Sequence, residues 1–281
     1  MIDWDDYPPD GEPPEEAQRR DPKTDEAKEA IKKVVKSAGP TVFYSRQLEV
    51  RLEREFFHWV TNRAVRELID EGFFSVREVK LAASARVRFL IPRGVRYHAR
   101  LIKKSGDIVK QYSAPTFTSA CGEQADMLFL NAFAVNGFRC LGQDVNEFRG
   151  KKWMKSNHDL DLIIERDEIV YGVEVKNTLD YISRDELRTK VAMCDFLEVV
   201  PLMVLRAAPK SYIWTEVARA GWGAEHRGFV LLYGTLIYPF GWEQFAGEVR
   251  TVLGLPAQCP RGIEQGHINR FLGWHRKRWG V

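Results

Sequence analysis

The stretch HDLDLIIERDEIVYGVEVKN, residues 158–177, holds two short apolar runs on either side of a polar tip. The first run covers residues 160–164 and the second covers residues 169–175. Apolar runs around a charged tip predict a β-hairpin, in which successive side chains point to opposite faces. We expect the turn to be centred between Asp167 and Glu168, which sets the pairing of the two strands.

This pairing gathers charged side chains on one face of the hairpin. Asp161 is predicted to lie opposite Glu174, and Asp159 opposite Lys176, while Gly172 leaves room beside Glu174. Two carboxylates that face each other destabilise a sheet by up to about 1 kcal/mol unless a cation lies between them. Carboxylate oxygens suit Mg²⁺ or Mn²⁺. An ammonium on the same face could orient an attacking water or help to deprotonate it, or stabilise charge on a phosphate.

The other face of the hairpin is apolar, which predicts that helices bury it. Its side chains are Leu160, Leu162, Ile164, Tyr171, Val173 and Val175.

The triplet Glu-Val-Lys also occurs at residues 78–80. No acidic residue in an apolar run comes just before this copy. Alternation along a strand places Glu78 and Lys80 on one face, as in a solvent-facing pair on a half-exposed sheet. We therefore assign this copy a structural role and the copy at residues 174–176 a chemical one.

Helices and a strand are predicted on both sides of the hairpin. A helix is expected from Ser119, as its cap, to Gly137, and it carries Glu123 in its first turns. Residues 183–198 predict a second helix and residues 199–209 a further strand.

These features together resemble the PD-(D/E)XK nuclease superfamily, whose signature is a helical Glu, an Asp on a strand and then (D/E)xK on the next strand. The resemblance covers about residues 116–206 and implies an α/β (α+β) fold with a restriction-endonuclease-like αβββαβ core. It implies that Asp161, Glu174 and the carbonyl of Val175 hold Mg²⁺ or Mn²⁺. Glu123 would bind the ion directly or through water.

By the same resemblance, Lys176 is the catalytic lysine beside the three carboxylates. The proline in the name of the signature is absent before Leu160, so Asp159 is an alternative to Asp161 as the metal ligand. The position opposite Glu174 favours Asp161.

Charge is distributed unevenly along the chain. Residues 1–40 carry 7 Lys+Arg against 11 Asp+Glu, residues 41–113 carry 15 against 8, and the remainder carries 20 against 20. A basic block beside a neutral one indicates a polyanion-binding module, with an ordinary solvated face as the alternative. We predict a disordered acidic leader (1–24), a nucleic-acid-binding domain (25–113) and a nuclease domain (114–281).

Within the second of these parts, the predicted order is helix, strand, two helices and a basic hairpin over residues 75–102, which resembles a winged-helix domain. That resemblance implies a helix over residues 57–70 in the major groove of DNA and a hairpin on phosphates. Winged helices also bind proteins. The candidate DNA contacts are Asn62, Arg63, Arg66, Arg86, Arg88, Arg93, Arg188 and Lys190. The last two lie on the predicted helix that follows the hairpin of residues 158–177, which we call the acidic hairpin, and they could face phosphate or solvent.

Composition narrows the class of protein. Hydrophobic residues make up 44% and charged residues 29% of the chain, and no stretch approaches the roughly 18 uncharged apolar residues of a membrane helix. The acidic, proline-rich start resembles neither a secretory signal nor a transit peptide. Four widely spaced cysteines predict reduced thiols, so a cytoplasmic location is expected.

We therefore expect a Mg²⁺-dependent deoxyribonuclease, in which a winged-helix module holds duplex or branched DNA for an endonuclease of restriction, repair or recombination type. A homodimer would let two sites cut both strands. One alternative is a DNA-binding regulatory or architectural protein with an inactive nuclease-like domain. Another is an enzyme that acts on RNA or on a branched junction.

Overall fold

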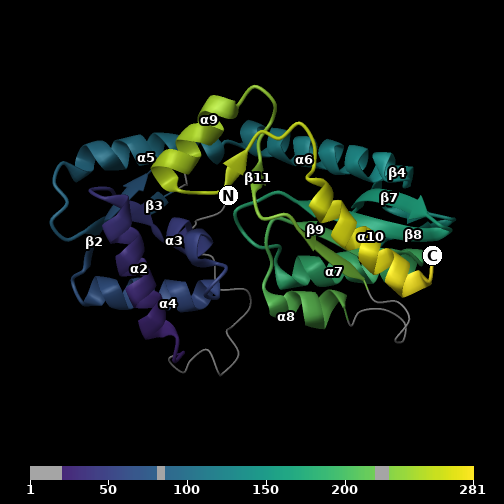
Figure 1. The fold of residues 1–281 in the computed structure, drawn as a ribbon, viewed down its shortest axis with the longest axis horizontal. Coiled ribbons are helices and arrows are strands. Elements are labelled where there is room, and N and C mark those ends of the chain that lie inside the picture. The colour runs from purple at the N-terminus through teal and green to yellow at the C-terminus, as the bar shows by residue number, and fades with distance from the viewer. Residues whose placement is uncertain (1–20, 81–85, 219–227) are drawn as a thin grey trace. The chain divides into compact units, whose positions relative to one another are not determined.

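The computed structural model describes residues 21–80, 86–218 and 228–281. It shows a mixed α+β protein with helices and several sheets, in agreement with the predicted class (Figure 1). The first 20 residues of the predicted leader lie outside the described residues, as does the break of the basic hairpin near residues 82–84. No helix in the described part of the chain is long and apolar enough to cross a membrane.

The chain divides into two compact units, and the division differs from the predicted boundary after residue 113. One unit comprises Met1–Thr118 and Phe245–Pro256, and the other comprises Ser119–Gln244 and Ala257–Val281. The sequence assigned residues 245–256 to the nuclease domain. They join the first unit because Leu253, in η2 (Val249–Leu253), is buried and its carbonyl accepts a hydrogen bond from the side chain of Gln47 at 2.7 Å.

The first unit contains a three-stranded antiparallel sheet in the order β1-β3-β2, and its helices α2 to α4 share one buried apolar cluster with this sheet. Its elements are α2 (Thr24–Ala38), β1 (Phe43–Tyr44), α3 (Ser45–Leu52), α4 (His58–Asp70), β2 (Phe74–Lys80), β3 (Arg86–Pro92) and α5 (His98–Tyr112). Helix α5 corrects the prediction that the basic hairpin continues to residue 102. Ile102, Val109 and Tyr112 are buried on one side of α5, and the exposed basic residues between them concealed this helical period.

The second unit is built on a five-stranded mixed sheet in the order β10-β9-β8-β7-β4. Strands β4, β7 and β8 are antiparallel, while β8, β9 and β10 are parallel. The elements are α6 (Pro115–Val135), β4 (Arg139–Val145), β5 (Glu147–Phe148), β6 (Lys151–Lys152), β7 (Leu160–Arg166), β8 (Ile169–Lys176), α7 (Arg184–Leu197), β9 (Val200–Leu205), α8 (Lys210–Tyr212), η1 (Ile213–Val217), β10 (Phe229–Leu232), β11 (Leu236–Ile237), β12 (Ala257–Gln258) and α10 (Gln265–Trp279). Helix α9 (Glu243–Glu248) begins in this unit, and from Phe245 onward it belongs to the first unit.

Two boundaries in this region differ from the prediction. Helix α6 begins at Pro115 rather than at Ser119, because proline fits the first helical turn, where its missing N–H is not needed. The segment expected to be a link after Gly137 contains the edge strand β4, which pairs with β7.

The predicted register of the acidic hairpin is confirmed. Leu162 pairs with Val173, and the pairing continues through Ile164 and Tyr171 to the turn. Asp167 and Glu168 form that turn with φ of 51° and 64°, which is the left-handed backbone of a two-residue type I′ hairpin.

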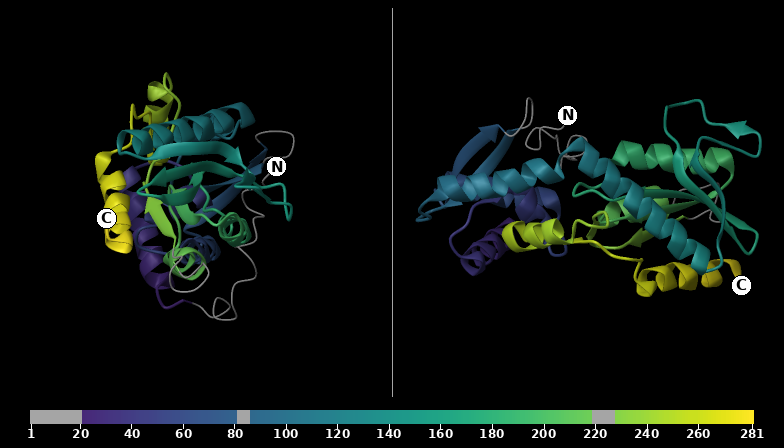
Figure 2. Two further views of the ribbon diagram at one scale, coloured as in Figure 1. Left: turned by 90° about the vertical axis from the view of Figure 1, so that its right-hand side faces the viewer. Right: turned by 90° about the horizontal axis from the view of Figure 1, so that it is seen from above.

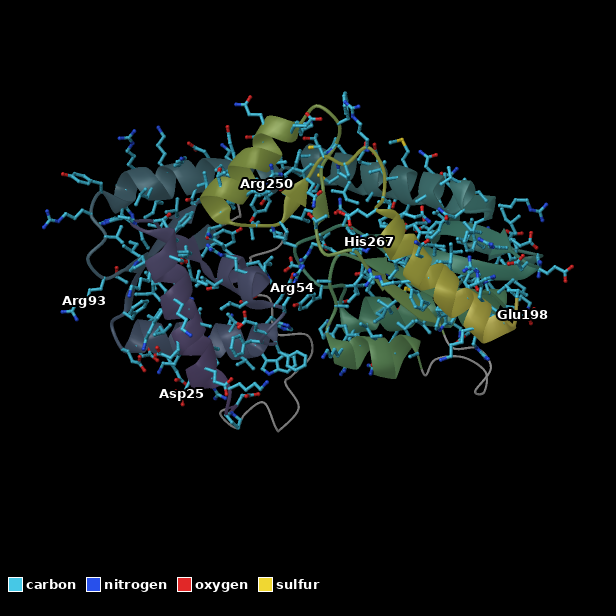
Figure 3. The ribbon with its side chains drawn as sticks, in the orientation of Figure 1. Asp25, Arg54, Arg93, Glu198, Arg250 and His267 are labelled. Atoms are coloured by element: carbon cyan, nitrogen blue, oxygen red, sulfur yellow. The ribbon has the colours of Figure 1, made fainter. Side chains whose placement is uncertain are left out.

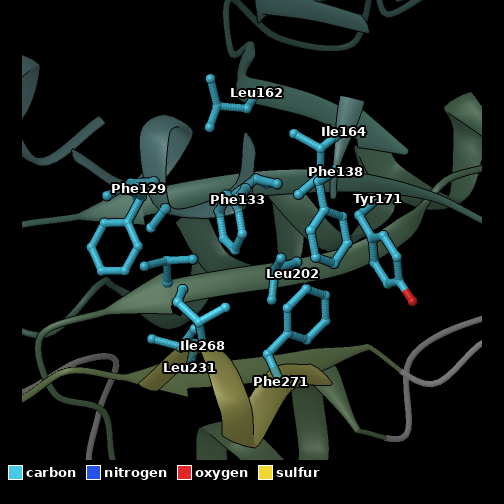
Figure 4. Close-up of a cluster of buried hydrophobic side chains, with 14 of the residues drawn as sticks. Phe129, Phe133, Phe138, Leu162, Ile164, Tyr171, Leu202, Leu231, Ile268 and Phe271 are labelled. Atoms are coloured by element: carbon cyan, nitrogen blue, oxygen red, sulfur yellow. The ribbon is translucent and has the colours of Figure 1, made fainter. Parts of the chain in front are cut away.

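Helices bury both faces of the five-stranded sheet (Figures 1 and 2). Helices α6 and α10 pack on one face around aromatic residues such as Phe133 and Phe271 (Figure 4), and α7 packs on the other. Leu160 belongs to the α7 side, not to the face predicted for it. It lies against Gly172, where an added Cβ would be 2.8 Å from the Leu160 side chain. Gly172 is therefore closely packed and leaves no spare room.

Candidate active site

The candidate site lies where β7 and β8 continue beyond the last paired residues of the hairpin. The Oδ2 atom of Asp161 accepts a hydrogen bond from the backbone N–H of Val175 at 2.6 Å. This bond holds the half-buried carboxylate of Asp161 beside β8, next to the buried Glu174. The structure thus places Asp161, rather than Asp159, against the strand that carries Glu-Val-Lys.

Glu174 has a counter-ion that the sequence analysis assigned elsewhere. The Nζ atom of Lys190, on α7, lies 2.5 Å from Oε2 of Glu174, and both side chains are almost fully buried. The same ammonium donates a hydrogen bond to the carbonyl of Asp159 at 2.5 Å. Lys190 was predicted to face phosphate or solvent, and this is wrong, because the inner side of α7 packs on the sheet.

Burial, helped by the charge of a neighbouring carboxylate, raises the pKa values of the two site carboxyls. Burial first, and then the charge of Asp161, raise the pKa of Glu174 to about 8. Burial also raises the pKa of Asp161, against the opposing effect of the Val175 N–H. Burial alone would lower the pKa of Lys190, but Glu174 and its neighbours outweigh burial and raise it. The buried site therefore disfavours the charged form of both carboxyls.

Lys176 follows Glu174 by two residues and is paired with the first turn of α7. Its Nζ atom lies 2.6 Å from Oε1 of Glu186, and both side chains are partly exposed. Ser183 caps α7 by accepting the N–H of Glu186 at 3.1 Å. Glu186 was not among the predicted site residues, although Ser-x-x-Glu at a helix start is the pattern of a capping box, which places the glutamate in the first turn.

Helix α6 brings a second carboxyl near the site in addition to the predicted Glu123. Glu123 is exposed, and its charge is one of those that raise the pKa of Asp126. Asp126, one helical turn later, is half-buried, and burial followed by the charge of Asp161 raises its pKa to about 7. No group of three or more His, Cys, Asp or Glu residues among the described residues is arranged to hold a metal ion.

The predicted DNA contacts have different surroundings. Asn62 donates to the side chain of Glu49 at 3.1 Å. Arg188 lies against Glu216 through two hydrogen bonds of 3.0 and 3.1 Å, because both side chains project from neighbouring helices of the second unit. Arg63 is half-buried, and Arg86 is exposed but pairs with Glu78 at 2.9 Å. Arg66, Arg88 and Arg93 are exposed as well.

Two further predictions are confirmed. Glu78 and Lys80 are exposed on β2, as expected of a solvent-facing pair. All four cysteines are free thiols: Cys121, Cys140, Cys194 and Cys259.

Comparison of the chain with protein-family models, with curated proteins and with solved structures found no match.

Proposed function

We propose that this protein is a metal-dependent nuclease that hydrolyses DNA phosphodiester bonds. The observation that carries the proposal is the carboxylate of Asp161, held by the Val175 N–H beside buried Glu174, two residues before Lys176. The order α6, β4, β7, β8, α7, β9 also supports a restriction-endonuclease-like core, because it is helix, three strands, helix, strand. In the first unit, the order of helices and strands from α2 to β3 supports a winged-helix module.

The donor atoms suit Mg²⁺ or Mn²⁺. Two carboxylates are enough, since Mg²⁺ is commonly bound through one or two carboxylates together with waters and substrate phosphates. Asp161, Glu174 and the Val175 carbonyl would hold the ion, with Asp126 as the nearby carboxyl of α6. When bound, the ion would supply a water of lowered pKa and neutralise charge on the phosphate.

The two lysines have separate tasks in this proposal. The partly exposed Lys176 orients the attacking water or contacts the phosphate, and Glu186 limits where its ammonium can lie. Buried Lys190 touches Glu174 and the Asp159 carbonyl, so it positions the carboxylate. It is not placed to touch a substrate.

A cleavage assay on a panel of substrates tests the proposal. Linear duplex, single-stranded DNA, a four-way junction and RNA would each be incubated with Mg²⁺ and with EDTA. We expect cleavage of DNA in Mg²⁺ only, and a loss of at least about 100-fold in the variant Lys176→Ala, in the range typical of removing a group that acts in the transition state. Cleavage that survives EDTA would contradict the metal assignment. Preferential cleavage of RNA would correct the substrate class.

A second function has one observation in its favour. The ammonium of Lys190 already lies against Glu174, as it would in a nuclease-like domain that no longer binds a metal. Such a DNA-binding regulatory protein would bind DNA in a salt-dependent way, but it would not nick DNA in the presence of any divalent metal. The four free thiols suit the reducing cytoplasm in either case.

A further inference from the structure

Tyr97, the residue before α5, is exposed to solvent. Its side chain is 86% exposed, and its backbone is left-handed, with φ of 56° and ψ of 27°. Such backbone is rare for a large residue and tends to persist where function requires it. The side chain does not cap the helix, and it forms no hydrogen bond or ring contact with the described residues. Folding alone therefore gives no reason for an aromatic ring here.

The surroundings of Tyr97 are strongly basic. Between residues 93 and 110 the chain carries six lysines and arginines beside a single acid, Asp107. All six are exposed. Arg93 and Arg96 precede α5, and the other four lie on α5, opposite its buried apolar side: Arg100, Lys103, Lys104 and Lys110. Figure 3 shows the side chain of Arg93 extending away from the ribbon.

Helix α4, which the sequence analysis placed in the DNA groove, is less suited to a polyanion. Asn62 is engaged by Glu49, and the same helix and its end carry Glu67, Asp70 and Glu71. The outer side of α5 offers several cations to phosphates, and Tyr97 offers a flat ring to a base. An exposed aromatic among cations is how proteins bind single-stranded nucleic acid, since every base can stack on a ring. In an intact duplex the bases are already stacked on each other.

We propose that Tyr97 and the basic side of α5 form a binding site for unpaired DNA, in which Tyr97 stacks on a base and the cations contact the flanking phosphates. This rests on the proposed function for DNA as the ligand and deepens it, because it specifies substrates with a single-stranded segment. The ring and the helix both belong to the first unit, so the site needs no contribution from the candidate active site.

Fluorescence anisotropy in EDTA tests this inference without cleavage. The probes are a single strand, a blunt duplex of the same sequence and a duplex with an unpaired branch. We expect Tyr97→Asn, whose new residue tolerates left-handed backbone, to weaken binding of the single strand and the branch roughly tenfold and binding of the duplex by less than about twofold. Tyr97→Phe should retain binding, and 2-aminopurine in the strand should be quenched by the wild type but not by Tyr97→Asn.

Phe240→Asn is a matched control, because Phe240 is also highly exposed, at 73%, but lies outside the basic segment. It should bind all three probes as the wild type does. If Tyr97→Asn binds every probe normally, or loses duplex and single strand equally, the stacking site is wrong. EDTA separates binding from cleavage. If the protein cuts DNA but Tyr97→Asn does not weaken binding, only this inference is refuted. A protein that binds through Tyr97 but never cuts refutes only the nuclease.

Discussion

The buried contact between Glu174 and Lys190 is the central electrostatic feature of the site. A carboxylate that is 3% exposed would be very costly without a partner, and Lys190 supplies the counter-charge. Removing one member of such a pair leaves an uncompensated buried charge, whereas replacing both can cost little. The two residues should therefore behave as a unit in stability measurements.

We expect Lys190→Met to lower the free energy of unfolding by about 1 to 3 kcal/mol, because it leaves the buried carboxyl of Glu174 without the side chain that contacts it. Adding Glu174→Gln should recover a large part of that loss, and urea denaturation of the two single variants and the double variant measures the coupling. Additive effects in this cycle would show that the two side chains do not interact in solution.

Asp126 should make stability depend on pH. Its ordinary pKa of 3.8 rises to about 7 in the folded chain, so the folded state holds a proton that the unfolded state releases. Stability is then lost as pH rises from 3.8 towards 7 and stays lost above that. Asp126→Asn removes this penalty. In EDTA, its advantage over the wild type should grow between about pH 5 and about pH 8, by about 1 to 2 kcal/mol after solvent screening. An advantage that is equal at both pH values would contradict the assignment.

Among the elements, the acidic hairpin is the one most clearly predictable from sequence. Its apolar runs and polar tip determine the register, and the pairing of Leu162 with Val173 agrees with it. Leu160 could not be placed by alternation, because its side chain fills the space that Gly172 leaves open across the strands. The burial of Lys190 and Asp126 could not be predicted from the sequence for a similar reason, since the packing of a helix on a sheet decides which polar side chains become buried.

We expect Gly172→Ala to destabilise the second unit. An added Cβ would lie 2.8 Å from atoms of Leu160, Cys194 and Val199, and overpacking of this kind costs about 1 to 3 kcal/mol. Gly122→Ala is the matched control, because nothing lies within 4 Å of its added Cβ. That variant should be neutral or more stable, since alanine favours a helix over glycine. Equal midpoints in urea for both variants would contradict the close packing.

At the scale of the whole molecule, the two compact units have other limits than the parts predicted from charge segregation. The first unit takes in residues 245–256, which are distant in sequence and join it through buried residues such as Leu253. Contacts of this kind between remote segments leave no periodic signal in a single sequence. The basic block does contain exposed cations, but none of those in α5 was among the predicted DNA contacts.

The most direct test of the central claim compares the two Glu-Val-Lys triplets in one assay of plasmid nicking in Mg²⁺. One variant carries Glu174→Gln and Lys176→Ala, and its matched control carries Glu78→Gln and Lys80→Ala. We expect the first to abolish nicking and the second to nick at the wild-type rate, because Glu78 and Lys80 are exposed on β2, away from any acidic partner of the kind that Asp161 provides. Equal loss in both variants, or nicking that persists without Glu174 and Lys176, would contradict the account.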